Sequence, residues 1–136
     1  MKRRALILAA VLVAVSPSLG ASGLPPLREV PRIDDGLLAV GIADEIRKRC
    51  DGIDARMFRA LRTLSDLKSE ARAMGYSDDQ IEAYVTSKAE KARMKARGAA
   101  YLAAHGASLQ DTESLCALGR DEIAKGSQIG ALLKEK

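Results

Sequence analysis

The sequence of 136 residues has no tryptophan, one phenylalanine, three tyrosines and one histidine. With so few aromatic side chains, a stacking platform for sugars or nucleic-acid bases is not expected. Phosphate-binding glycine loops, Gly-x-Ser-x-Gly and His-Glu-x-x-His motifs are absent from the sequence as well. We therefore predict no catalytic residue and no cofactor, and interpret the protein as a non-enzyme.

Histidine and cysteine ligands for a metal ion are also scarce. The single histidine, His105, lies near the end of a predicted helix, where we expect it on the surface or capping carbonyl groups rather than acting as a general base or metal ligand. The acidic pairs, such as Asp34 with Asp35, are accounted for by helix capping and solvation. No metal site is predicted.

The first 20 residues have the pattern of a signal peptide. Residues 2–4 are Lys-Arg-Arg, residues 5–15 are an unbroken apolar run, and small or helix-breaking residues follow up to Gly20 and Ala21. The run is shorter than the roughly 20 residues of a membrane-spanning helix. We therefore predict cleavage near Gly20, no transmembrane anchor afterwards, and a periplasmic or secreted protein.

The net charge is less basic than it first appears. The chain has 22 Lys and Arg residues against 18 Asp and Glu, but three of the basic residues lie in the predicted signal peptide. The remaining 19 basic and 18 acidic residues nearly balance. A nucleic-acid partner, which requires clustered excess positive charge, is therefore not expected.

Two cysteines, Cys50 and Cys116, fit the predicted compartment, where thiols usually pair. A disulfide between them would close a long loop and restrict the unfolded chain by about 4 kcal/mol. The alternatives are a reactive thiol pair or half of a metal site. Redox cysteines usually lie in a Cys-x-x-Cys turn and structural zinc needs four ligands, so we favour the disulfide.

The chain beyond the signal peptide predicts an all-α fold. Three prolines indicate an extended arm over residues 21–33, followed by a single helical domain over residues 34–136. We expect a small four-helix arrangement, closed by the disulfide, with the first helix beginning at Asp34-Asp35. The other three helices are expected at residues 55–74, 78–104 and 111–125. Ser77 and Gln80 form the pattern of a capping box, and no segment is predicted to be a strand.

Two of these predicted helices have apolar or small residues at regular spacing along one side. In the second, apolar residues recur at steps of three and four: Met57, Leu61, Leu64, Leu67, Ala71 and Met74. In the third, the predicted inner seam is mostly alanine, which favours close helix packing with little room for a pocket: Ile81, Val85, Ala89, Ala92, Ala96, Ala99 and Ala103.

The third helix also carries a basic stretch that is a candidate contact for an acidic partner or an anionic surface. Its members are Lys88, Lys91, Arg93, Lys95 and Arg97. The alternative is a solvated helix face without a partner. Few large apolar residues interleave with these charges, so an inserted membrane helix is not expected.

Several segments together resemble a bacterial family of short secreted proteins of unknown function: Leu24-Pro25-Pro26-Leu27-Arg28, Asp34-Asp35-Gly36-Leu37, Ala43-Asp44-Glu45-Ile46-Arg47, Gly75-Tyr76-Ser77, Tyr84-Val85 with Ser87-Lys88, and Leu115-Cys116. The resemblance implies a gene near those of respiratory complex I, and some members of the family are labelled as the iron–sulfur subunit of an NADH dehydrogenase. The residues contradict that label, because the cluster of the true subunit needs four cysteines and this chain has two.

Two functions follow as expectations. The first is a non-catalytic accessory or interaction protein of the cell envelope, with respiratory complex I as a partner that the resemblance suggests. The second is a small soluble periplasmic protein that binds a ligand between its helices. The sequence does not predict an oligomeric state.

Overall fold

The structure is a computed structural model that describes residues 23–136. These residues form five α-helices, two short 3₁₀ helices and a two-stranded sheet. The predicted signal peptide, residues 1–20, lies outside the described residues. Among residues 23–136, no helix is both long enough and apolar enough to cross a membrane.

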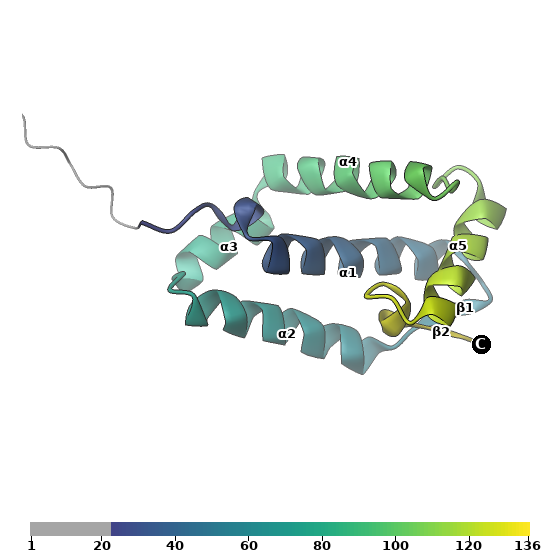
Figure 1. The fold of residues 1–136 in the computed structure, drawn as a ribbon, viewed down its shortest axis with the longest axis horizontal. Helices are drawn as coiled ribbons and strands as arrows, with labels where there is room; N and C mark the ends of the chain where they lie inside the picture. Colours follow the sequence, from purple (N-terminus) through teal and green to yellow (C-terminus); the bar gives the residue numbers. More distant parts are fainter. Residues whose placement is uncertain (1–22) are drawn as a thin grey trace, which may run out of the picture.

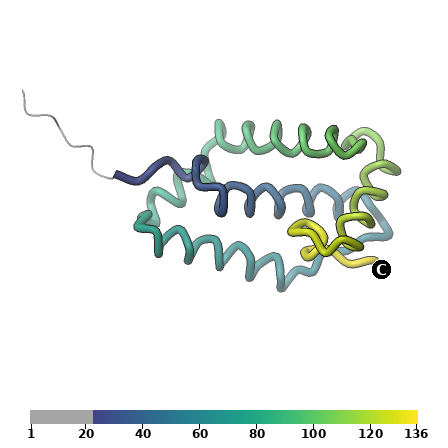
Figure 2. Tube along the Cα trace, in the orientation of Figure 1, coloured from purple at the N-terminus to yellow at the C-terminus, as the bar shows by residue number. Residues whose placement is uncertain are grey.

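Helix α1 (Pro31–Arg49) is the centre of the fold and contacts α2 (Met57–Ala73), α4 (Lys88–Ala104) and α5 (Thr112–Lys125). Figure 1 shows α2 and α4 running alongside α1, one on each side. Helix α3 (Asp78–Thr86) connects α2 to α4 at one end of this layer, and α5 crosses the other end. The tube in Figure 2 follows the same path along the chain. Helix α1 is therefore flanked rather than enclosed by its two long neighbours.

The expectation of an extended arm ending in a helix at Asp34-Asp35 is wrong. Residues Leu27–Glu29 form the 3₁₀ helix η1, and α1 begins three residues early, at Pro31. Proline at the first position of a helix needs no amide hydrogen and has a suitable φ, so Pro31 starts the helix instead of preventing it. The arm is also packed, since Leu27 is buried and the Tyr76 hydroxyl donates to the Pro25 carbonyl oxygen at 2.6 Å.

The expectation of four helices is corrected to five, because the predicted third helix is two helices that meet at Ser87. Ser87 ends α3 in an extended conformation and begins α4, where its hydroxyl oxygen accepts from the Glu90 amide at 3.2 Å. The Ser-x-x-Glu pattern at residues 87–90 is a helix-start signal that the prediction of one continuous helix ignored. The capping box predicted at Ser77 and Gln80 is confirmed at the start of α3.

Strands are present although none was predicted. Strand β1 (Ile53–Ala55) pairs antiparallel with β2 (Leu133–Glu135), which follows the 3₁₀ helix η2 (Gly130–Leu132). Each strand has three residues, too few for an alternating pattern to be visible in the sequence. The pairing joins the segment after α1 to the end of the chain.

The predicted disulfide is confirmed. Cys50, at the end of α1, is bonded to Cys116 in α5, with their Cα atoms 5.6 Å apart. It belongs to a core cluster around Ile46 and Leu115, both fully buried. A second, smaller cluster lies at the α3 end: Leu27, Ile33, Leu67, Ala71, Tyr76 and Ile81.

The two predicted stripes are largely on the outside. In α2 only Leu67 and Ala71 are buried, whereas the other four residues of the stripe are exposed: Met57, Leu61, Leu64 and Met74. In α4 the alanines of the predicted seam face solvent. The break at Ser87 changes the direction of the chain, so the seam of one continuous helix no longer applies.

Candidate functional site

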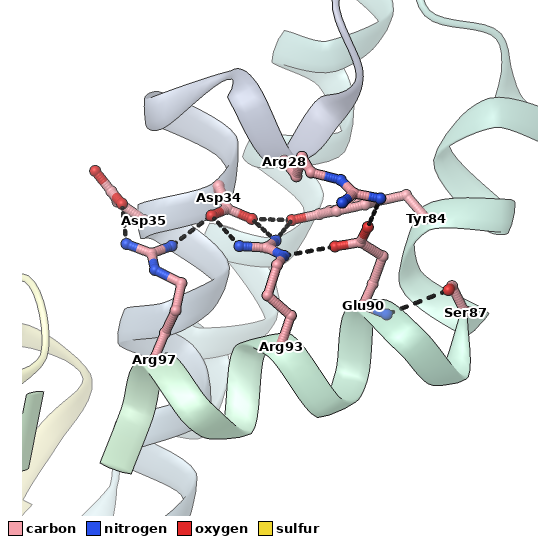
Figure 3. Close-up of polar contacts among 8 residues, drawn as sticks. All are labelled: Arg28, Asp34, Asp35, Tyr84, Ser87, Glu90, Arg93 and Arg97. Atoms are coloured by element: carbon pink, nitrogen blue, oxygen red, sulfur yellow. Dashed lines mark hydrogen bonds and ion pairs between the residues drawn. The ribbon is translucent and has the colours of Figure 1, made fainter. Parts of the chain in front are cut away.

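A buried ion-pair network joins α1, α3 and α4. Asp34 is 4% exposed and lies in the first part of α1. Arg93 of α4 donates to both of its carboxylate oxygens, at 3.0 Å from Nη1 and 2.5 Å from Nη2. Arg97 and the hydroxyl of Tyr84 also donate to this carboxylate. Figure 3 shows these side chains converging on Asp34.

Glu90 extends the network to the start of the chain. Its carboxylate accepts from Arg93 Nε at 2.8 Å and pairs with Arg28 of η1 at 2.6 Å. Arg97 donates at 2.8 Å to Asp35, a side chain that is half-exposed. Four elements are thereby held together by charged hydrogen bonds, as Figure 3 shows.

The network shifts the pKa values of Asp34 and Tyr84. Burial acts to raise the pKa of the Asp34 carboxyl, but the hydrogen bonds from Arg93 and Tyr84 and the charges of Arg93 and Arg97 outweigh it, and the pKa lies below its usual value. Burial, together with the hydrogen bond to Asp34 and its charge, raises the pKa of Tyr84 well above 10. Asp34 is therefore ionised at neutral pH and Tyr84 is neutral.

The five basic residues predicted as a contact surface divide into two groups. Arg93 and Arg97 turn inward and pair with Asp34, so they hold α4 against α1. The three lysines, Lys88, Lys91 and Lys95, are exposed and form no ion pair within residues 23–136. Arg93 and Arg97 thus contribute to the contact between α4 and α1, whereas the three lysines remain on the surface.

A second buried carboxylate, Glu122 of α5, is 2% exposed. It accepts from the hydroxyl of Tyr101 at 2.6 Å and from that of Ser127. Burial and the Glu122 contact raise the pKa of Tyr101 to about 12. His105 stacks on Tyr101 at the end of α4, with ring centroids 4.1 Å apart, and its Nδ1 lies 2.7 Å from the Tyr101 carbonyl oxygen.

The buried polar side chains of these clusters are paired. Every buried side-chain nitrogen and oxygen atom in the described part has a hydrogen-bond partner. Among residues 23–136, no group of three or more His, Cys, Asp and Glu side chains is arranged to hold a metal ion. The candidate site with a positive feature of its own is an exposed apolar surface.

An exposed apolar surface, which we call the open face, extends across α1, α2 and α3. Its large side chains on α2 are Met57, Leu61 and Leu64, exposed by 48%, 57% and 38%. Val85 of α3 is 41% exposed and borders one end. The complete set, with its α1 members, is Leu37, Val40, Gly41, Met57, Leu61, Leu64 and Val85.

The open face is hollowed into two connected grooves, and a third groove adjoins it. Two grooves between α1 and α2, of about 340 and 380 Å³, share Leu37 and Leu64. A third, of about 660 Å³, lies between α1 and α4 and shares Gly41 and Asp44 with its neighbour. Its apolar residues include Ile42, Met94, Leu102 and Leu109, with Lys91 and Lys95 beside them. The alanine-rich seam predicted close helix packing with little room for a pocket, and the groove between α1 and α4 shows that this prediction is wrong.

Gly41 lies where the grooves meet. It occupies the middle of the 19-residue helix α1, where glycine costs roughly 1 kcal/mol relative to alanine. A Cβ atom at this position would meet nothing within 4 Å, so packing inside this chain does not require glycine. The missing side chain instead leaves the grooves open to each other across α1.

Comparison with known proteins adds the family. The model described as a family of unknown function (DUF5333) matches residues 25–134. The chain belongs to this family. No curated protein and no solved structure matches it. The matched DUF5333 region contains the ion-pair network, the disulfide and the open face.

The sequence pattern identified the α2 side chains of the open face and Val85, but not its α1 members Leu37, Val40 and Gly41. The spacing in α2 was recognised, and its apolar residues do share one side of the helix. Among residues 23–136, α4 does not cover them, because it lies on the other side of α1 from α2. The pairing of Asp34 with Arg93 was missed, since ion pairs between distant segments leave no local pattern.

Proposed function

We propose that this DUF5333 protein is a non-catalytic, exported interaction protein that docks on a partner in the cell envelope through its open face. The observation that supports this most is the exposure of the apolar stripe of α2. Contiguous apolar patches on soluble proteins commonly mark interaction sites. Full burial of one exposed Leu or Met side chain contributes about 1.5–3 kcal/mol. Met57, Leu61 and Leu64 are already partly buried, so each would contribute a fraction of this on docking.

The disulfide supports the proposed compartment, since disulfides persist mainly in oxidising spaces such as the periplasm. The family resemblance suggests the first partner to test. Because related genes are expected near those of respiratory complex I, we propose that complex as the leading candidate on the outer face of the membrane.

An affinity pull-down from gently solubilised native membranes tests the docking function. We expect the wild-type protein without its signal peptide to enrich a defined partner, and Leu61→Glu to lose it. Ser69→Glu is the matched control, because it adds the same charge to an exposed position of α2 outside the open face. Equal enrichment by all three proteins, or none by the wild type, would exclude docking by this surface.

Ligand binding is the second candidate, favoured by the α1–α4 groove. Its volume of about 660 Å³ lies within the roughly 300–1,000 Å³ typical of small-molecule sites. A ligand held there would raise the melting temperature, and the shift would grow with the logarithm of the ligand concentration relative to its Kd. A thermal-shift screen with amphipathic anions checks this, and Met94→Trp, which fills the groove, should remove any shift.

A further inference from the structure

We propose that the open face receives an acidic amphipathic helix of the partner, laid along α1 between α2 and α4. This inference rests on the proposed docking function and adds the chemistry of the bound segment. It follows from the shape of the face and from the charges around it.

The shape fits a helix. The grooves on the two sides of α1 meet at Gly41 and together continue from Leu37 to Lys48. At 1.5 Å per residue this stretch of α1 is about 17 Å long, which matches roughly three turns of a partner helix. Since a Cβ atom at Gly41 would meet nothing in this chain, the glycine lets a partner helix approach the α1 backbone. An apolar stripe on that helix would then contact Leu61 and Leu64.

The charges favour an acidic partner. Lys91 and Lys95 on α4 lie beside the α1–α4 groove, and neither forms an ion pair within the described residues. On the α2 side, Lys68 shares its groove with the carboxylates of Asp78 and Glu82, which offset its charge. The acidic residue Asp44 at the groove junction is already neutralised by Arg47 and Lys48.

The uncompensated lysines therefore lie on the α4 side of α1. A helix with carboxylates on the flank of its apolar stripe that faces α4 would meet Lys91 and Lys95. Such charge complementarity sets the orientation of a helix bound in a groove and the preference between partners.

A concave face suits a helix better than a flat bilayer. The apolar residues of the α1–α4 groove include Ile42 and Leu102, which are buried, and the chain has no tryptophan to anchor it at a membrane interface. Binding to anionic lipid is the competing outcome, and the experiment must distinguish it from binding of a helix.

The test uses three synthetic 18-residue amphipathic helices with one leucine stripe and flanks of Glu, Gln or Lys. Their binding to the protein without its signal peptide is measured by fluorescence anisotropy. We expect the Glu peptide to bind tightest and the Lys peptide weakest. Lys91→Glu with Lys95→Glu should weaken binding of the Glu peptide by about tenfold and improve binding of the Lys peptide, because rim ion pairs become repulsions.

Two controls make the result specific. Arg62→Glu with Lys134→Glu changes the net charge equally at exposed sites away from the grooves, and should leave the order of the peptides unchanged. Gly41→Gln should weaken binding of the Glu peptide by about tenfold or more, whereas Gly41→Ala should bind nearly as well as wild type.

Three outcomes would overturn the inference: no saturable binding of any peptide, a peptide order that Lys91→Glu with Lys95→Glu leaves unchanged, or binding to anionic phosphatidylglycerol vesicles alone. If any of these occurs while the pull-down still depends on Leu61, the docking function stands and only the acidic helix is excluded. If the pull-down fails as well, the docking function is excluded with it.

Discussion

Replacing Asp34 by asparagine should destabilise the protein strongly. The substitution removes the charge but nearly keeps the volume, and it leaves the guanidinium groups of Arg93 and Arg97 facing a neutral amide. Breaking a buried ion pair costs about 3–5 kcal/mol. Because the two arginine side chains remain 27% and 34% exposed, water compensates part of this, and we expect about 2–3 kcal/mol. For a domain of this size that lowers the melting temperature by roughly 10 °C.

Asp35→Asn is the matched control, since Asp35 is the adjacent residue and also pairs with Arg97. Its side chain is 55% exposed, so its loss should cost no more than about 1 kcal/mol. Urea denaturation at pH 7 measures both differences. Equal destabilisation by the two substitutions would refute the distinction between the buried carboxylate of Asp34 and the surface pair of Asp35 with Arg97.

The pH dependence of the same pair of proteins provides an independent check. The folded-state pKa of Asp34 is below its usual value, so the ionised carboxylate stabilises the native state fully above the unfolded-state pKa of about 4. This contribution is lost as the pH falls from there through the folded-state pKa. The stability difference between wild type and Asp34→Asn should therefore be constant from pH 7 to 5 and shrink below about pH 4. A difference that stays constant down to pH 2 would contradict the assignment.

Three further substitutions test other features by denaturation. Gly41→Ala should stabilise by about 0.5–1 kcal/mol, because it adds helix propensity at an open position; a loss of stability would show that packing requires the glycine. Gly130→Ala should destabilise by about 3 kcal/mol, because a Cβ atom there would lie 1.8 Å from the Glu122 carbonyl oxygen, and a neutral effect would contradict this close approach. Cys50→Ala with Cys116→Ala should cost about 4 kcal/mol, and reductant should lower wild-type stability to the same level but leave the variant unchanged.

Local signals predicted local structure well. The capping box at Ser77 and the pairing of Cys50 with Cys116 both appear as expected. The start of α1 was misplaced because proline was interpreted only as a helix breaker, although Pro31 occupies the one helical position that suits it. The break at Ser87 also has a local signal in the sequence, the Ser-x-x-Glu capping pattern at residues 87–90.

The errors about burial have a different origin. Periodicity shows that Leu61 and Leu64 share a side of a helix, but it does not show whether another element covers that side. That depends on where α4 lies, and the position of α4 is set partly by the contact of Arg93 and Arg97 with Asp34. A pair of charges 59 residues apart in the chain thus helps to leave the open face uncovered.

The disulfide encloses a long loop that contains α2, α3 and α4. Both helices that border α1 therefore lie inside a covalent ring, while α1 precedes it. A protease that cuts any exposed turn between residues 50 and 116 does not release a fragment, because the bond still joins the two pieces. In an environment rich in proteases, a molecule cleaved once in this loop therefore remains one covalent unit, and its two pieces can still pack against α1.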